Sequence, residues 1–455
     1  MTNRFDYDAL GQRISTTDSL GNHICVFHDS KGNIRRYKDA AGFITQFNYD
    51  QAGRRIETTN PIGNRICSEY DCENRLIRKY GDTIPEQNSF DSYGRQITIE
   101  TTRSGDNWDR TTLVYDQPTG VLLKKQYANE TFVSFDYDHE SRVTRTTWAR
   151  GAWAENRYDD WGNIIAVIHD NPSADIKMNY DSFGRLVSSE SSSATYRYIY
   201  DATGLVTNEI SSILGKQREL HRIYDGFGRV SQTQILNTPF FQSVGYDIKG
   251  RITTIRNPSV NICFSYSNDS FDEGYQIAFS NTVFSSVLYR DVHRRYLILG
   301  SSNLLNSADI GYSFNYEYDQ IGRPIVRNRD TFGFTHKNEL EWIQNGTNSL
   351  HTTHYYYDYA GNWTSNTVDG NCTCYSANEL NQYVTINGRS PHSLVYDLDG
   401  NLITNGVWSY VFDSENRLVS VSSNGMVVVE NIYDAFSRRV GNEQQMPHMH
   451  IGMMK

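Results

Sequence analysis

The chain has 455 residues, of which 38% are hydrophobic and 13% aromatic, with 32 tyrosines and 20 phenylalanines against 9 prolines. Such a composition is typical of β-sheets whose faces are covered by aromatic rings. The net charge of −10 argues against a phosphate-binding surface, which needs clustered lysines and arginines, so we expect no nucleic-acid partner.

The N-terminal segment MTNRFDYDALGQR has no apolar region typical of a signal peptide. No stretch approaches the roughly 18 apolar residues of a membrane span. The six cysteines are too sparse for a disulfide framework. Cys372 and Cys374 would lie on one face of a strand, either as a vicinal redox pair or as two ordinary strand residues.

From the N-terminus onward the chain repeats a Tyr-Asp or Phe-Asp pair followed by a turn and often by arginine. Between Tyr49 and Tyr246 the step is about 21 residues, and fixed periods of roughly 20 to 50 residues mark arrays of repeated units. The pairs begin at Tyr7, Tyr49, Tyr70, Phe90, Tyr115, Tyr137, Tyr158, Tyr180, Tyr200, Tyr224, Tyr246, Tyr318, Tyr357, Tyr396, Phe412 and Tyr433.

Each repeat predicts one β-hairpin. In FITQFNYDQAGRRIETT, residues 43–59, side chains alternate with the period of a strand as far as Tyr49. Asp50 can accept a backbone hydrogen bond in an Asx-turn, and Gly53 can adopt a positive φ at the turn exit. Arg54 then begins the return strand. A second turn, such as TTNPIGN around Gly63, leads to the next repeat.

A single hairpin is only marginally stable, so the units must pair side by side into a continuous sheet. Equivalent tyrosines would then form a ladder of rings, and the arginine or asparagine after each glycine would bridge to the acidic turn of a neighbouring unit. We assign the motif a structural role; the alternative is a series of repeated ligand sites. Its representative residues are Tyr49, Asp50, Gly53, Arg54, Tyr180, Asp181, Gly184, Arg185, Tyr224, Asp225, Gly228 and Arg229.

The pattern weakens in the middle of the chain, and we divide the sequence accordingly. Regular hairpin repeats occupy residues 1–251, diverged β repeats 252–317, C-terminal repeats 318–440, and a disordered tail 441–455. The densest charge cluster of the diverged part is predicted to be a solvated edge; it contains Arg290, Asp291, His293, Arg294 and Arg295.

Beyond Tyr318 two segments, HKNELEWIQNG and YSANELNQYVTING, begin like short helices, with Ser376 as a plausible N-cap and Glu379 completing a capping box. Asn-Gly pairs at Asn387, Asn405 and Asn424 predict two-residue hairpins. The tail holds Met446, His448, Met449, His450, Met453 and Met454, for which a soft copper site is the alternative to an unstructured end.

No sequence motif for catalysis is present: there is no P-loop, GxSxG elbow or HExxH, and the histidines are scattered. Because every repeat carries an aspartate, paired carboxylates are uninformative. We therefore assign no catalytic, metal or cofactor-binding residues, and expect no enzyme activity and no cofactor.

The YDxxGR series, with YSANELNQY at residues 375–383 and WSYVFDSENRLVSV at residues 408–421, resembles the Rhs/YD-repeat proteins, which include bacterial toxin shells, Tc toxin C components and teneurins. This resemblance implies an all-β fold in which hairpins form a curved, spiralling sheet, a partial hollow shell. It also implies a secreted or cell-surface location and a structural wall that encloses or presents a polypeptide.

The resemblance also implies a C-terminal core that closes the shell and cleaves a toxin free, but its motifs are not found before Lys455. We therefore expect a fragment whose partner is the missing remainder of the shell or an enclosed polypeptide. The alternative function is a carbohydrate-binding surface module with Trp148, Trp153 and Trp161 as a platform for glycans. A β-propeller is the rival fold, disfavoured because the period is near 21 and not 40 to 45.

Overall fold

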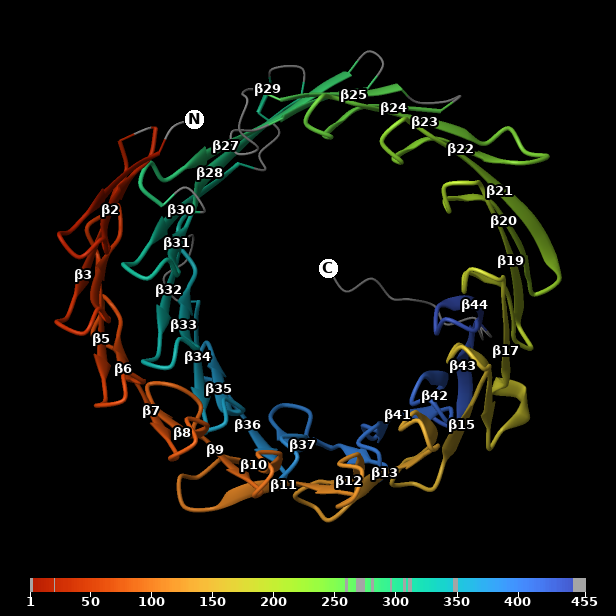
Figure 1. Ribbon diagram of the computed structural model, residues 1–455, viewed down its shortest axis with the longest axis horizontal. Coiled ribbons are helices and arrows are strands. Elements are labelled where there is room, and N and C mark those ends of the chain that lie inside the picture. Colours follow the sequence, from red (N-terminus) through yellow and green to blue (C-terminus); the bar gives the residue numbers. More distant parts are fainter. Residues whose placement is uncertain are drawn as a thin grey trace. The chain divides into compact units, whose positions relative to one another are not determined.

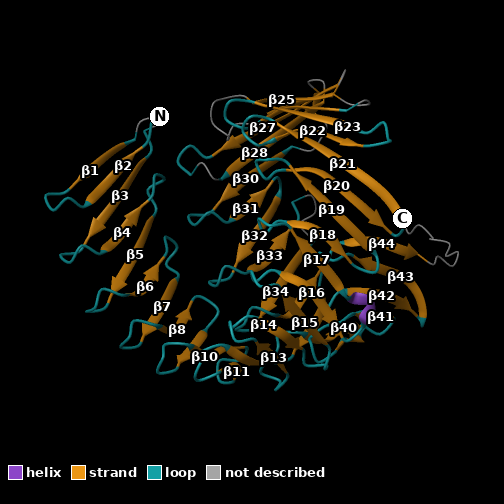
Figure 2. Ribbon diagram, turned by 45° about the vertical axis from the view of Figure 1, so that its right-hand side comes forward, coloured by secondary structure: helices purple, strands orange, loops and turns teal. Residues whose placement is uncertain are grey.

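The structure is a computed structural model that describes residues 3–19, 21–257, 261–266, 275–279, 282–294, 297–305, 308–309, 313–346 and 351–444. In this part of the chain almost all regular structure is strand, and the one helix is the short 3-10 turn η1 (Pro172–Ala174) (Figure 2). The expected all-β fold of tandem hairpins is confirmed. None of the described helices is long and apolar enough to cross a membrane. The tail residues Met446 to Met454, for which a copper site is the alternative to an unstructured end, lie outside the described residues.

The chain forms two compact units, each made from two separate stretches of sequence. Unit 1 comprises residues 1–111 and 262–381, and unit 2 comprises residues 112–261 and 382–455. In each unit we call the N-terminal stretch the first run of hairpins and the C-terminal stretch the second run.

Most strands of unit 1 are labelled in Figure 1. Two strands, β11 and β25, each cross a unit boundary. The first run contains β1 (Arg4–Tyr7), β2 (Arg13–Thr17), β3 (His23–His28), β4 (Ile34–Lys38), β5 (Ile44–Tyr49), β6 (Arg55–Thr59), β7 (Arg65–Tyr70), β8 (Leu76–Gly81), β9 (Glu86–Phe90), β10 (Gln96–Thr102) and the start of β11 (Trp108–Tyr115). The second run contains β25 (Asn261–Tyr266), β26 (Tyr275–Phe279), β27 (Thr282–Arg290), β28 (Ile298–Leu305), β29 (Ala308–Asp309), β30 (Phe314–Tyr318), β31 (Pro324–Arg327), β32 (Asp330–Phe334), β33 (Leu340–Gln344), β34 (Thr352–Tyr357), β35 (Trp363–Val368) and β36 (Asn371–Ala377).

Unit 2 is built in the same way. Its first run continues from β11 with β12 (Leu122–Gln126), β13 (Phe132–Tyr137), β14 (Val143–Thr147), β15 (Trp153–Tyr158), β16 (Ile164–His169), β17 (Ile176–Tyr180), β18 (Leu186–Glu190), β19 (Ala194–Tyr200), β20 (Val206–Ile213), β21 (Lys216–Tyr224), β22 (Val230–Ile235), β23 (Phe241–Tyr246) and β24 (Ile252–Arg256). Its second run contains β37 (Tyr383–Asn387), β38 (His392–Ser393), β39 (Val395–Tyr396), β40 (Leu402–Thr404), β41 (Trp408–Phe412), β42 (Leu418–Ser423), β43 (Met426–Tyr433) and β44 (Arg439–Gln444).

Consecutive strands of each first run pair antiparallel. The ladder is unbroken from β1 to β10 in unit 1 and from β12 to β24 in unit 2. Such a ladder does not divide into four-stranded blades, which excludes the β-propeller alternative.

The two predicted helices are wrong, because both segments are further copies of the hairpin turn. In the first, Thr335 replaces the aspartate and accepts the Glu339 N–H with its Oγ1, while Asn338 replaces the glycine with a φ of 68°. In the second, Asn378 and Asn381 take these positions, and Asn381 has a φ of 59°. The capping pattern was misleading because a side-chain oxygen that accepts backbone N–H groups two to four residues on serves both turns and helix starts.

The three Asn-Gly pairs have different outcomes. Asn424 and Gly425 both have positive φ, 50° and 78°, and join β42 to β43 in the predicted two-residue hairpin. At the second pair the turn is shifted by one residue. The Asn405 N–H donates to the Trp408 carbonyl, so Gly406 and Val407 form the two-residue tip. At Asn387 the prediction is wrong, because Ile386 pairs with His392 and the loop between them is longer.

Buried side chains are few, and in unit 2 they gather where the two runs meet. The residues concerned are mostly small: Ala152, Ala154 and Ala194 are at most 9% exposed, and Tyr196 is 3% exposed. Small side chains let the turns of one run approach the backbone of the other, so the principal core of this unit is the seam between its runs.

Candidate functional site: the aspartate turns and the buried seams

The aspartate of each repeat organises its own turn. Asp50 accepts the Arg54 N–H with Oδ1 at 2.9 Å and the Arg54 Nε–H with Oδ2 at 2.6 Å. The Gly53 N–H donates to the Asp50 carbonyl at 3.1 Å, and Gly53 has a φ of 80°, which is why glycine or asparagine is preferred there. This is a type I turn closed by a bulge, the usual geometry of a three-residue hairpin loop.

Tyrosine and arginine join each unit to its neighbours. The Tyr49 hydroxyl donates to the Ile34 carbonyl of the preceding hairpin at 2.8 Å. Arg54 lies over the ring of Tyr70 in the following hairpin, 5.3 Å from its centroid, and donates to the Asp71 carbonyl. Each unit is therefore connected to both neighbours by side chains as well as by the backbone ladder, as the sequence predicts for the arginine.

The other representative motifs repeat these contacts. In the Tyr180 unit, the Tyr180 hydroxyl donates to the Ile164 carbonyl, Arg185 pairs with Asp181, and Gly184 has a φ of 74°. In the Tyr224 unit, the Tyr224 hydroxyl donates to the Val206 carbonyl, Arg229 pairs with Asp225, and Gly228 has a φ of 76°.

The predicted ladder of tyrosine rings needs correction. Equivalent tyrosines lie two strands apart, about 9.6 Å, whereas contacting rings are separated by about 4.5 to 7 Å. The gap is occupied by the arginine of the earlier unit: Arg185 lies 4.4 Å from the ring centroid of Tyr200, and Arg229 lies 4.4 Å from that of Tyr246. The repeating contact is a guanidinium on a ring.

These contacts hold the turn carboxylates in the charged form. Backbone and side-chain hydrogen bonds from Arg54 lower the pKa of Asp50. Burial acts to raise the pKa of Asp181, but the hydrogen bonds from Arg185 outweigh it and the net shift is downward. A carboxylate with a lowered pKa that is committed to turn hydrogen bonds is poorly suited to act as a general acid or base at neutral pH.

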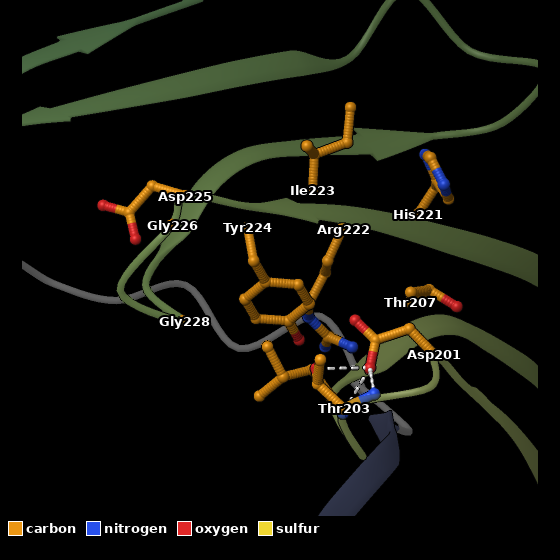
Figure 3. Close-up of a pocket in the computed structure, with 11 residues that line it drawn as sticks. Asp201, Thr203, Thr207, His221, Arg222, Ile223, Tyr224, Asp225, Gly226 and Gly228 are labelled. Carbon is orange, nitrogen blue, oxygen red and sulfur yellow. Dashed lines mark hydrogen bonds between the residues drawn. The ribbon is translucent and has the colours of Figure 1, made fainter.

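A depression of about 720 Å³ lies between two successive aspartate turns of unit 2 (Figure 3). It is lined by Asp201, Thr203, His221, Tyr224 and Asp225, among others. Asp201 accepts the Thr203 hydroxyl at 2.7 Å and the Leu205 N–H at 3.0 Å, so its carboxylate serves the turn. The depression is the groove between neighbouring repeats and brings no nucleophile and base together among the residues that line it.

The seam of unit 2 joins the interrepeat turns of the first run to the aspartate turns of the second run through buried polar and charged side chains. Arg150 forms an ion pair with Asp399, Nε to Oδ2, at 2.6 Å, and donates to the carbonyls of Phe412 and Asp413. His169, whose side chain is fully buried, lies with Nε2 3.1 Å from Glu415 Oε1. This contact lowers the pKa of Glu415.

A third contact closes the same seam. The Tyr196 hydroxyl donates to Asp434 Oδ2 at 2.8 Å, and the ring of Tyr196 lies 5.7 Å from that of Phe436 and 4.7 Å from the guanidinium carbon of Arg438. Burial and the Asp434 carboxylate raise the pKa of Tyr196 to about 12. Burial opposes ionisation of Asp434, but hydrogen bonds from Arg438 and Tyr196 lower its pKa.

In the seam of unit 1, donors from one run reach backbone carbonyls, neutral side chains or a ring of the other run. Asn64 is 5% exposed and donates with Nδ2 to the His336 carbonyl at 2.6 Å. Arg103 pairs with Asp109 on its own run and donates to the Ala377 carbonyl of the second run at 2.7 Å.

Two members of the charge cluster predicted as a solvated edge, His293 and Arg294, contact the first run at this seam, and Arg295 lies outside the described residues. Arg294 is only 8% exposed and lies over the ring of Phe43 at 5.0 Å, and His293 Nδ1 lies 3.1 Å from Asn22 Oδ1. The prediction is wrong for Arg294. Its guanidinium lies over a ring and donates to the Asp319 carbonyl, so its charge is compensated without water.

The three tryptophans proposed as a glycan platform do not lie together. Trp148 is in the turn before β15 and Trp153 begins that strand, whereas Trp161 follows its far end and is 85% exposed. A six-residue strand is about 20 Å long, so Trp161 cannot share a platform with the other two. Cys372 and Cys374 are exposed on one face of β36, with Sγ atoms 3.8 Å apart.

The sequence alone missed the seam residues. Arg150, His169 and Tyr196 lie outside the Tyr-Asp motif, and their partners are separated from them by well over two hundred positions. The acidic turn tips at Asp399 and Glu415 do not reveal the seam, because Glu73 and Glu140 occupy the same turn position in the first runs. Among the described residues, no three His, Cys, Asp or Glu side chains are grouped to hold a metal ion.

Fold and contacts together define a protein of tandem tyrosine-aspartate hairpins whose runs pack turn to turn. Comparison with protein families agrees: residues 70–218 and 329–450, more than half of the chain, match the teneurin YD-shell model, and residues 28–65 match the RHS repeat model. The chain belongs to the teneurin YD-shell family. The resemblance inferred from the sequence is confirmed.

A solved structure supports the same fold, whereas no curated protein matches the chain. The crystal structure of TcdB2-TccC3-Cdc42 aligns with 96% of this chain at a TM-score of 0.73 and 14% sequence identity. A Tc holotoxin pore of Photorhabdus luminescens and the crystal structure of TcdB2-TccC3 align with 98% of this chain at 12% identity, each with a TM-score of 0.39. The chain spans 27% to 31% of these larger chains.

Proposed function

We propose that this chain is a wall segment of a YD-repeat shell that encloses or presents a polypeptide, and that it performs no catalysis itself. The observation that carries the proposal is the side-chain connection between consecutive hairpins, in which each tyrosine reaches the preceding unit and each arginine the following one. These side chains are used to hold the wall together, which leaves the function to the surface that the wall presents.

Membership of the teneurin YD-shell family supports this proposal, and a match to Tc toxin assemblies is in keeping with it. On the same basis we propose that the protein acts outside the cell or at its surface. The division into repeats 1–251, 252–317 and 318–440 with a separate tail remains our proposal for how the sequence is organised.

Small-angle X-ray scattering of the purified full chain, with its mass from light scattering, tests this function. A wall around a hollow gives a pair-distance distribution whose maximum is shifted toward long distances. A compact or rod-like profile would contradict the proposal. Trypsin resistance of an unfolded reporter fused after Lys455, compared with the same reporter mixed in free form, tests enclosure separately; equal digestion rates would contradict it.

A further inference from the structure

Three aspartate turns of unit 2 share the pattern Asp-x-Phe-x-Arg. They centre on Phe183, Phe227 and Phe436, and in each the phenylalanine N–H donates to the aspartate Oδ1 at 2.9 Å. The arginine of each turn lies over its own phenylalanine ring, at 5.2, 5.1 and 4.9 Å. The three turns are therefore local copies of one another.

Of these three turns, only the one in the second run is covered by a side chain of the other run. There, Tyr196 of the first run packs on Phe436 and donates to Asp434, whose side chain is fully buried. Phe436 is 39% exposed.

The two copies in the first run are open. Phe183 and Phe227 are 82% and 87% exposed, and the side chains of Asp181 and Asp225 retain 20% and 23% exposure. Trp161 stands at the same turn position of another repeat and is 85% exposed. Several large apolar side chains presented along one edge mark a surface for protein association.

Unit 2 also presents the complementary edge. Two turns of unit 2 are closed by equivalent backbone hydrogen bonds. In the turn before Tyr196 the Ser191 N–H donates to the Ala194 carbonyl, and in the other turn the Asn405 N–H donates to the Trp408 carbonyl. This correspondence places Tyr410 where Tyr196 stands. Its turn is open, because Val407 and Trp408 are 54% and 38% exposed, whereas Ala194 in the seam is 3% exposed.

The two open edges cannot meet within one unit. Phe183 lies at the tip of the β17–β18 hairpin, and the turn at the other end of β18 is already in the seam through Ser193, which donates to the Tyr433 carbonyl. In the second run the aspartate turns occupy the seam, so the turn at Val407 lies at the far ends of β40 and β41. The Phe183 and Phe227 edge is therefore on the outer side of the first run, and the Val407 and Trp408 edge is on the outer side of the second run.

We propose that the Phe183 and Phe227 edge binds the Val407 and Trp408 edge of a second copy of this chain, with Tyr410 contacting a phenylalanine and an aspartate as Tyr196 does in the seam. The association is head to tail. Arg185 and Arg229 keep one ring contact each with the next repeat, so the new contacts fall on phenylalanine and aspartate. Heterologous contacts of this kind extend unless a rotation closes them.

Sedimentation velocity over a concentration series tests the proposal with the full chain. The mass of the wild type is expected to rise beyond that of a dimer. Phe183→Ser with Phe227→Ser in one variant, and Val407→Ser with Trp408→Ser in another, are each expected to weaken association at least about tenfold, because both remove buried apolar contacts. Tyr356→Ser, which changes a side chain 52% exposed on a strand of unit 1, is the control and should associate like the wild type.

Mixing the two double variants gives the sharpest result. Each retains the edge that the other lacks, so the mixture is expected to form a one-to-one dimer that does not grow. A wild type that stays monomeric overturns the proposal, and so does a mixture that forms no dimer. If the mixture forms no dimer while the wild type forms dimers, the contact is between two Phe edges. Circular dichroism establishes that each variant is folded; if a double variant is not, Phe227→Ser alone replaces it, with the same expectation at reduced size.

Discussion

The two units solve one packing problem in different ways. Both bury a seam between the turns of two hairpin runs, but unit 2 crosses it with Arg150–Asp399, His169–Glu415 and Tyr196–Asp434, whereas unit 1 uses Asn64 and donors to backbone carbonyls. Buried charged groups are costly unless they are paired. Loss of a cross-seam partner should therefore cost more at Arg150 and Asp399 of unit 2, where both partners are charged, than at Asn64 of unit 1, where both are neutral.

The largest effect is expected from Arg150→Met. The change leaves Asp399, whose side chain is 2% exposed, without its counter-ion, and loses two hydrogen bonds to carbonyls. Breaking a buried pair from one side costs about 3–5 kcal/mol. Hydrogen exchange should become faster in β15, β40 and β41, and the free energy of unfolding from urea titration should fall.

Two further variants show whether the unpaired buried charge causes that loss of stability. Arg157→Met removes a 61% exposed arginine beside Glu155 and should change the unfolding free energy by less than about 1 kcal/mol. Arg150→Met combined with Asp399→Leu should recover part of the loss, since both charges are gone. If the single and double variants are equally unstable, the buried charge is not the cause.

A smaller effect is expected from Tyr196→Phe. The ring contact with Phe436 is kept, but Asp434 loses the hydroxyl that donates to Oδ2. Asp434 Oδ2 keeps the Arg438 Nε–H at 2.7 Å, so the loss is that of one hydrogen bond to a charged group, about 1.5–3 kcal/mol. Thermal unfolding monitored by hydrogen exchange in β43 and β44 measures it, with Tyr356→Phe, at a residue that is 52% exposed, as the unchanged control. Equal melting of the two variants would show that the hydroxyl contributes nothing.

In unit 1 we expect a still smaller loss. Asn64→Ala removes the neutral hydrogen bond to the His336 carbonyl and the 3.2 Å contact between Asn64 Oδ1 and His336 Nδ1, at a cost of about 1–2 kcal/mol. Faster exchange confined to β6, β7 and β33 is the expected sign. A loss as large as that of Arg150→Met would remove the distinction drawn between the two seams.

The hairpins could be predicted from the sequence because their determinants are local. Asp50, Gly53 and Arg54 lie within one turn, and the tyrosine and arginine contacts reach only the adjacent repeats. The seams could not be predicted, because every aspartate turn looks alike in sequence. Phe183 and Phe436 have the same local pattern, and only the fold decides that one is open and the other is covered.

The same limit explains the individual errors. Thr335 and Asn378 replace the aspartate of the turn, so their segments could be interpreted as helix starts. Arg294 was assigned to solvent because no nearby sequence reveals Phe43 as its cover. Local chemistry thus determines the hairpin, and the distance between the two runs along the chain hides the partners across the seam.

The smallest expected effect, a dependence on pH, separates an open aspartate turn from a covered one. Hydrogen bonds from the turn arginine lower the pKa of Asp225, and Asp434 receives the Tyr196 hydroxyl in addition. A lowered folded-state pKa contributes stability that is present above the unfolded value of about 3.9 and is lost as the pH falls through the folded value. Acidification below about pH 4 should therefore weaken both turns, and Asp434 should contribute more.

Asp434→Asn and Asp225→Asn form a matched pair for this comparison. Each keeps an oxygen for the turn N–H groups but removes the titrating charge. Urea titrations at pH 7, 5, 4 and 3 should show the wild type and each variant converging as the pH falls, and the difference at pH 7 should be larger for Asp434→Asn. Identical curves for the two variants would mean that the Tyr196 hydroxyl does not favour the ionised form of Asp434, and that the seam of unit 2 gains nothing from the charge it buries there.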